Sequence, residues 1–231
     1  MQTIYCISGL GADERTFQYL DLSFAEPVFI KWITPCKNET LQAYAMRLKD
    51  KFIPDENPVI VGLSLGGMIA VEIAKTLPAA HAIIISSAKT RNEVPYYWKA
   101  FKYFPLYKIL PEWSVKRQTL VRNYILSSKS LLAKNYVHQV AKDADIKFYR
   151  WAIGAILNWQ NQIIPPNVIH IHGTSDKLLP NNFVKADFTI NNGGHLMVIE
   201  NASEVSSKLK QILVREAFEK RTTCSSKRKA Q

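Results

Sequence analysis

The stretch NPVIVGLSLGGMIAVEIAKTLP, residues 57–78, constrains the fold more than any other part of the chain. A short apolar run rich in β-branched residues leads into Gly62-Leu63-Ser64-Leu65-Gly66, and a helix-like run follows. A sharp strand-to-helix turn forces its central residue into a strained backbone, typically with positive φ. Glycines two positions to either side leave room for such a turn, which predicts that Ser64 is displayed at the end of a buried strand. The alternative is a glycine-rich turn in which Ser64 only caps the helix.

The rest of the chain supplies the strands and helices that this turn needs. Four apolar, strand-like runs alternate with helix-like runs between residues 3 and 89. The alternation resumes over residues 167–195, and a last helix is expected over about 196–220. Near-continuous apolar strands separated by helices indicate a parallel sheet covered on both faces.

Residues 90–162 interrupt this alternation. They contain no comparable β-rich run, hold 14 of the 25 aromatic residues, and are expected to form several helices with breaks near Pro105 and Pro111. The aromatic side chains are expected mostly to pack, with some of them lining a pocket above Ser64. We therefore predict one discontinuous α/β core (1–89 and 163–220), an inserted helical cap (90–162) and a basic, disordered tail (221–231).

The formal net charge of +11 is concentrated in two parts of the chain. Residues 90–162 hold 12 lysines and arginines against four acidic residues, and residues 215–231 hold six against two. The basic cap is either a solvated face or attracts an anionic partner, such as an acyl carrier's phosphate, an acidic ester or a membrane surface. No motif for specific nucleic-acid recognition accompanies the charge.

Asp176 and His195 are the best partners for an activated Ser64. Each follows a predicted strand, and the carboxyl ends of parallel strands meet at one edge of a sheet, where ligands bind in open α/β folds. A serine nucleophile needs a base, and the base needs an orienting carboxylate. The alternatives are a turn-capping carboxylate for Asp176 and a surface-loop histidine for His195.

An oxyanion hole requires two backbone N–H groups near the reacting carbonyl. Leu65, directly after the nucleophile, is expected to give one of them. The loop SGLGADERTF, which follows the first strand, is expected to give the other from Leu10. A plain glycine-rich connection is the alternative for that loop.

Other histidines and cysteines give weaker signals. His170 and His172 face the same side of a predicted strand, but no third metal ligand is apparent, so packing or loop support is the favoured interpretation. Cys6, Cys36 and Cys224 show neither metal nor disulfide spacing, which fits a reducing compartment. We expect no membrane span and no signal peptide, and hence a cytoplasmic protein.

The segments SGLGAD, GLSLGG, HGTSD and GGH together resemble the α/β-hydrolase fold superfamily across residues 1–220. In size and spacing the chain is similar to the small capped branch of esterases, thioesterases and related hydrolases. The resemblance implies an α/β-hydrolase fold with a mostly parallel sheet of about six strands. Two departures are Ser8-Gly9, where many members have His-Gly, and a chain that begins directly with the strand bearing that loop.

These observations lead us to expect a serine hydrolase that cleaves a carboxylic ester or thioester of a small acyl substrate, which is anionic if the basic cap serves to attract it. Ser64 is the expected nucleophile, His195 the general base and acid, and Asp176 the orienting carboxylate, with no cofactor and no metal. The alternatives are a non-catalytic ligand-binding protein on the same fold, and an acyltransferase or C–C bond hydrolase that uses the same residues.

Overall fold

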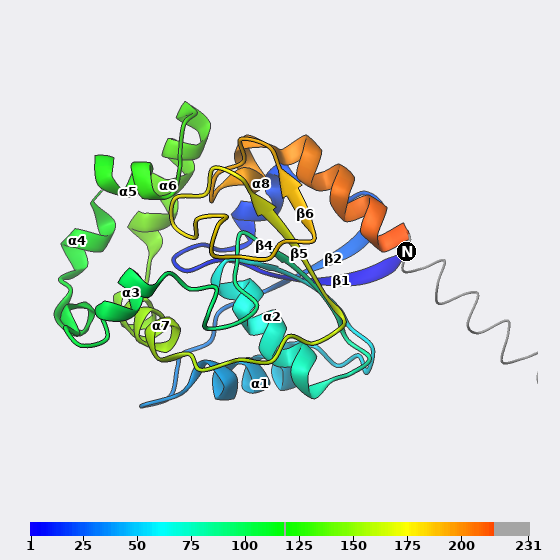
Figure 1. Ribbon diagram of the computed structural model, residues 1–231, viewed down its shortest axis with the longest axis horizontal. Helices are drawn as coiled ribbons and strands as arrows, with labels where there is room; N and C mark the ends of the chain where they lie inside the picture. Colours follow the sequence, from blue (N-terminus) through cyan, green and yellow to red (C-terminus); the bar gives the residue numbers. More distant parts are fainter. Residues whose placement is uncertain (118, 215–231) are drawn as a thin grey trace, which may run out of the picture.

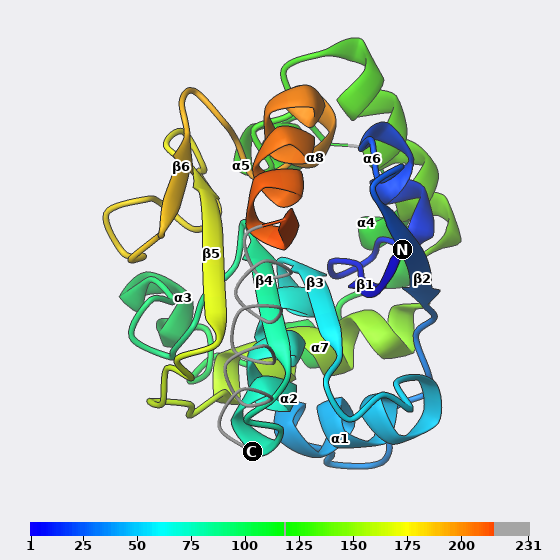
Figure 2. The ribbon, with the colours of Figure 1, turned by 90° about the vertical axis from the view of Figure 1, so that its right-hand side faces the viewer.

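The computed structural model describes residues 1–117 and 119–214, so the expected tail at 221–231 lies outside the described residues. Its centre is a six-stranded sheet (Figure 1). The strands are β1 (Gln2–Ile7), β2 (Ala25–Ile30), β3 (Val59–Leu63), β4 (His81–Ile85), β5 (Val168–Gly173) and β6 (Phe188–Ile190). All neighbouring pairs are parallel, in the order β2-β1-β3-β4-β5-β6, which Figure 2 shows from β6 to β2. The predicted parallel sheet of about six strands is confirmed.

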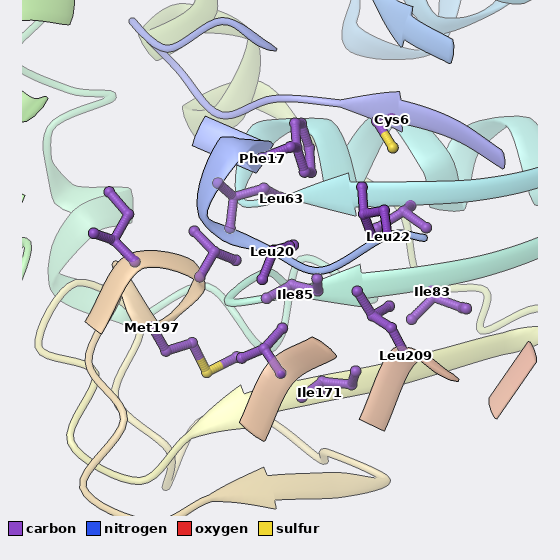
Figure 3. Close-up of a cluster of buried hydrophobic side chains, with 14 of the residues drawn as sticks. Cys6, Phe17, Leu20, Leu22, Leu63, Ile83, Ile85, Ile171, Met197 and Leu209 are labelled. Carbon is purple, nitrogen blue, oxygen red and sulfur yellow. The ribbon is translucent and has the colours of Figure 1, made fainter. Parts of the chain in front are cut away.

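Successive side chains of the strands enter two separate hydrophobic cores, because a strand alternates its side chains between the two faces of a sheet. Ile4 and Cys6 of β1 belong to one core, whereas Tyr5 and Ile7 belong to the other. Figure 3 shows the first core, where strand residues such as Ile83 pack with residues of the C-terminal helices. Both faces are therefore buried, which explains the near-continuous apolar strand sequences.

Helices cover both faces of the sheet. α1 (Leu41–Phe52) and α2 (Leu65–Thr76) lie on one side, and α8 (Met197–Glu200) and a helix over residues 202–214 lie on the other (Figure 1). The short 3₁₀ helix η1 (Glu14–Tyr19) adds Phe17 to the same core as α8. The single last helix expected over 196–220 is wrong in its described part: Asn201 leaves the helical conformation at φ −123° and ψ 34°, and separates two helices there.

Between β4 and β5 the chain forms helices, as expected for residues 90–162. They are α3 (Tyr96–Ala100), η2 (Leu106–Ile109), α4 (Glu112–Lys116), α5 (Leu120–Ile125), α6 (Leu131–Asp143) and α7 (Ile146–Asn158). η2 and α4 begin directly after Pro105 and Pro111, where the breaks were expected. α6 and α7 also add buried side chains to the two cores. The division of the chain into a core and an inserted cap stays a prediction.

None of the helices in the described ranges combines the length and the apolar composition that a membrane span requires.

Candidate active site

Ser64 occupies a strained turn between β3 and α2. Its backbone lies at φ 52° and ψ −115°, a region that non-glycine residues rarely adopt, and its N–H donates to the carbonyl of Ile85 on β4 at 2.9 Å. A Cβ atom on Gly62 would lie 2.4 Å from the carbonyl oxygen of Gly66, and one on Gly66 would lie 2.2 Å from that of Ile7. Gly62 and Gly66 are therefore required, because any side chain at either position would overlap with backbone atoms that cannot move away.

The Ser64 hydroxyl does not cap the helix. It makes no hydrogen bond to the first turn of α2, so the capping interpretation is wrong. Instead, Oγ lies 3.0 Å from Nε2 of His195. The sequence analysis missed Ser87, whose hydroxyl donates to the carbonyl oxygen of Ser64 at 2.6 Å and anchors the turn to the end of β4. The polar pair Ser86-Ser87 after an apolar strand was the available signal.

Asp176 and His195 lie together beside Ser64, and both are buried. Nδ1 of His195 is 2.8 Å from Oδ2 of Asp176, while Oδ1 accepts hydrogen bonds from the N–H groups of Leu178 and Leu179, each at 2.9 Å. Asp176 is thus both a turn-capping carboxylate and the partner of the histidine. Burial opposes its ionisation, but the charge and hydrogen bond of His195 and the N–H of Leu179 outweigh burial and lower the pKa of Asp176.

This arrangement fixes the proton positions of the site. A carboxylate only accepts, so Nδ1 of His195 carries the proton and Nε2 is free to accept from the Ser64 hydroxyl. The three residues follow β3, β5 and β6, at the shared carboxyl edge of the sheet. The structure therefore brings together the three side chains that the sequence analysis singled out.

His170 and His172 form a buried pair behind Asp176. Nε2 of His172 donates to the carbonyl of Leu179 at 2.8 Å and lies 3.6 Å from Oδ2 of Asp176, so His172 supports the loop that holds the carboxylate. Its Nδ1 must then accept from Nε2 of His170, 3.1 Å away. Nδ1 of His170 is left buried without a hydrogen-bond partner among the described residues.

Both histidines of this pair are held neutral. Burial lowers the pKa of His172, which the Asp176 carboxylate offsets only in part. Burial is the main cause that holds the pKa of His170 well below its usual range, and the positive charge of Lys89 lowers it further. Within the described ranges no group of three or more His, Cys, Asp or Glu side chains could hold a metal ion, and His172 acts as the loop support that was favoured for it.

Leu65 and Leu10, the two expected donors of the oxyanion hole, both line the pocket that contains Ser64. Leu65 is the first residue of α2, so its N–H has no acceptor within the helix. Neither N–H makes a hydrogen bond to another residue of the described chain. The Ser8 hydroxyl donates to the carbonyl of Ala12 at 3.0 Å, and this bond closes the loop on which Leu10 lies. Ser8 thereby supports this loop.

A cavity of about 440 Å³ extends from Ser64 and His195. Its walls are mostly aliphatic side chains from the loop after β1 and from α5, α6 and α7, with aromatic contributions from Trp98, Tyr136 and Tyr149. Its one permanently charged lining residue in the described chain is Arg122, whose Nη2 donates to the carbonyls of Ser114 and Val115. The cavity therefore suits an apolar group, because its walls are mostly aliphatic and the Arg122 guanidinium already donates hydrogen bonds to backbone carbonyls.

Comparisons with known proteins agree on the fold. A family model described as "Alpha/beta hydrolase family" matches residues 9–207. No curated protein sequence matches the chain.

Solved structures of several hydrolases are similar to the chain. A thermophilic esterase from Thermogutta terrifontis has a TM-score of 0.70 at 13% identity, with 93% of this chain and 90% of that chain covered. An esterase from Exiguobacterium antarcticum has a TM-score of 0.69 at 15% identity, with 94% and 91% covered. An N-acyl homoserine lactonase complexed with N-butanoyl homoserine has a TM-score of 0.66 at 14% identity, with 92% and 89% covered. Similarity at these identities shows a shared fold.

Proposed function

Because the chain belongs to the alpha/beta hydrolase family, we propose that it is a serine hydrolase acting through Ser64, His195 and Asp176 on a carboxylic ester or thioester. The supporting observation is the continuous hydrogen-bonded chain, 3.0 Å from the Ser64 hydroxyl to His195 and 2.8 Å from His195 to Asp176. These distances fall within the reach required of a nucleophile and its base.

The chemistry follows from the proton positions. Ser64 Oγ attacks the acyl carbonyl carbon as Nε2 of His195 takes the hydroxyl proton, and the resulting oxyanion accepts from the N–H groups of Leu65 and Leu10. His195 then gives this proton to the departing alcohol or thiol, which leaves the acyl group bonded to Ser64. A water molecule loses a proton to His195 and attacks the acyl-enzyme, releasing the carboxylic acid and restoring the serine.

The cavity favours an apolar acyl group over a charged one. Its aliphatic walls stabilise hydrocarbon, and Arg122 is engaged with backbone carbonyls. That solved esterases share the fold supports the choice of an ester, although the fold by itself hosts several chemistries.

Fluorophosphonate labelling followed by peptide mapping tests the proposal. We expect the probe to modify Ser64 in the wild-type chain, no modification in Ser64→Ala, and unchanged labelling in the control Ser23→Ala, because Ser23 is exposed and outside the site. A folded wild-type chain that neither reacts nor hydrolyses a p-nitrophenyl ester would refute the hydrolase and support a binding protein. Product analysis with an added alcohol acceptor distinguishes hydrolysis from acyl transfer.

A further inference from the structure

Exposed hydrophobic side chains gather in one part of the described chain. Residues 96–132 hold 13 of the 19 large hydrophobic side chains that the described residues expose. Among the most exposed are Tyr103, Phe104, Leu106, Ile109, Trp113 and Leu120. The expectation that aromatic residues of this region mostly pack is therefore wrong for this stretch. We call the exposed side chains of residues 96–132 the aromatic-basic surface.

The same stretch is strongly basic. It contains seven lysines and arginines and one acidic residue, Glu112, which forms an ion pair with Lys116 at 2.6 Å. Lys102, Lys108 and Lys129 are exposed between the hydrophobic positions. The aromatic-basic surface thus offers apolar contact area together with a net positive charge, because Glu112 pairs with only one of its seven basic side chains.

This surface adjoins the active-site cavity. α3, α4 and α5 lie together at one end of the molecule (Figure 1). Val121 both lines the cavity and is mostly exposed, and Val115 and Arg122 line the cavity from the same stretch. The wall of the cavity therefore continues directly into the aromatic-basic surface.

We propose that the aromatic-basic surface docks the protein on a lipid bilayer that contains anionic lipids. Tryptophan and tyrosine favour the interface between water and lipid, and lysine and arginine are attracted to anionic headgroups there. A second copy of the chain would oppose two positive surfaces, whereas an anionic bilayer complements both the charge and the apolar area. Docking is a binding property and does not depend on the proposed hydrolysis.

Vesicle co-sedimentation of the full chain tests this proposal, with Ser64→Ala as the background so that turnover is excluded. We expect binding to phosphatidylcholine vesicles that contain phosphatidylglycerol, and weaker binding to pure phosphatidylcholine and at high salt. Leu106→Ser/Ile109→Ser should lower the partition coefficient about tenfold, because both side chains are apolar and exposed. The matched control is Ile163→Ser/Val214→Ser: these side chains are 63% and 61% exposed, against 65% and 73% for Leu106 and Ile109, but lie outside the surface.

The outcomes distinguish docking of this surface on a bilayer from binding through the C-terminal charges and from dimer formation. Equal loss in both double variants, or no dependence on phosphatidylglycerol, would overturn the proposal. Binding that survives Leu106→Ser/Ile109→Ser but disappears when Lys227, Arg228 and Lys229 are changed to glutamine would assign the affinity to the C-terminal charges instead. Sedimentation velocity that detects a dimer, abolished by Leu106→Ser/Ile109→Ser, would make a second copy the occupant. Circular dichroism establishes that each variant is folded.

Discussion

Replacing Asp176 by asparagine tests how the carboxylate sets the proton positions of the site. Oδ1 of Asp176 accepts from two backbone N–H groups, those of Leu178 and Leu179. An asparagine carbonyl oxygen will take that position, so its NH₂ group will face His195. His195 must then accept at Nδ1 and carry its proton on Nε2, where it cannot receive the proton of Ser64.

The structure sets a lower limit on the rate loss expected for Asp176→Asn. Turning the asparagine around would restore the productive tautomer but would lose two backbone hydrogen bonds, at about 1–1.5 kcal/mol each. That cost of about 2–3 kcal/mol corresponds to a rate loss of roughly 30- to 150-fold. Loss of the negative charge that stabilises the imidazolium should extend the loss toward about 10⁴-fold in kcat.

The assay is kcat/KM on a short p-nitrophenyl ester, with urea unfolding to compare stabilities. Asp50→Asn is the matched control, since Asp50 is exposed and its one ion pair within the described ranges is with its neighbour Lys49. A folded Asp176→Asn variant that loses less than about tenfold in kcat/KM would refute the idea that Asp176 fixes the tautomer of His195.

Two further predictions concern stability. Gly66→Ala should lower the free energy of unfolding by about 3 kcal/mol or more, despite the better helix propensity of alanine, because its Cβ would lie 2.2 Å from the carbonyl oxygen of Ile7. The control is Gly9→Ala, whose Cβ would make ordinary contacts from 3.4 Å and should cost far less in the same urea titration. Equal losses of stability in the two variants would contradict the turn geometry. Because the pKa of His170 is lowered in the folded chain, the unfolded chain binds a proton at this histidine that the folded chain does not bind. The contribution of neutral His170 to stability is therefore complete above the unfolded pKa of about 6.5 and is lost as the pH falls. Urea unfolding between pH 7.5 and 5.5 should therefore show a shallower pH dependence in His170→Gln than in wild type, by at most about 1.4 kcal/mol per pH unit, and identical slopes would contradict this account.

Local sequence could predict the parallel sheet and the turn at Ser64, because each depends on short-range patterns. Near-continuous apolar runs mark strands buried on both faces, and the glycines around Ser64 mark a backbone that few residues tolerate. The positions of Asp176 and His195 could also be inferred, since residues that follow parallel strands share one edge of the sheet.

Other features depend on contacts between residues that are distant in sequence. Ser87 is unremarkable until β4 is placed beside β3, where its hydroxyl reaches the carbonyl of Ser64. The sequence favours packing or loop support for His170 and His172, but only the hydrogen bond to the carbonyl of Leu179 fixes their proton positions and shows which loop His172 supports.

The sequence by itself determined that residues 90–162 are aromatic and basic, because composition needs no partner. Whether an aromatic side chain is buried depends on what packs against it, and that is decided only when the chain is folded. The tertiary structure buries Tyr136 and Phe148 in the two cores and leaves Phe104 and Trp113 in solvent. Phenylalanine in this segment is thus buried at one position and exposed at another. The reason is that α6 and α7 place side chains in the two buried cores, whereas the segment before them adds fewer side chains to these cores.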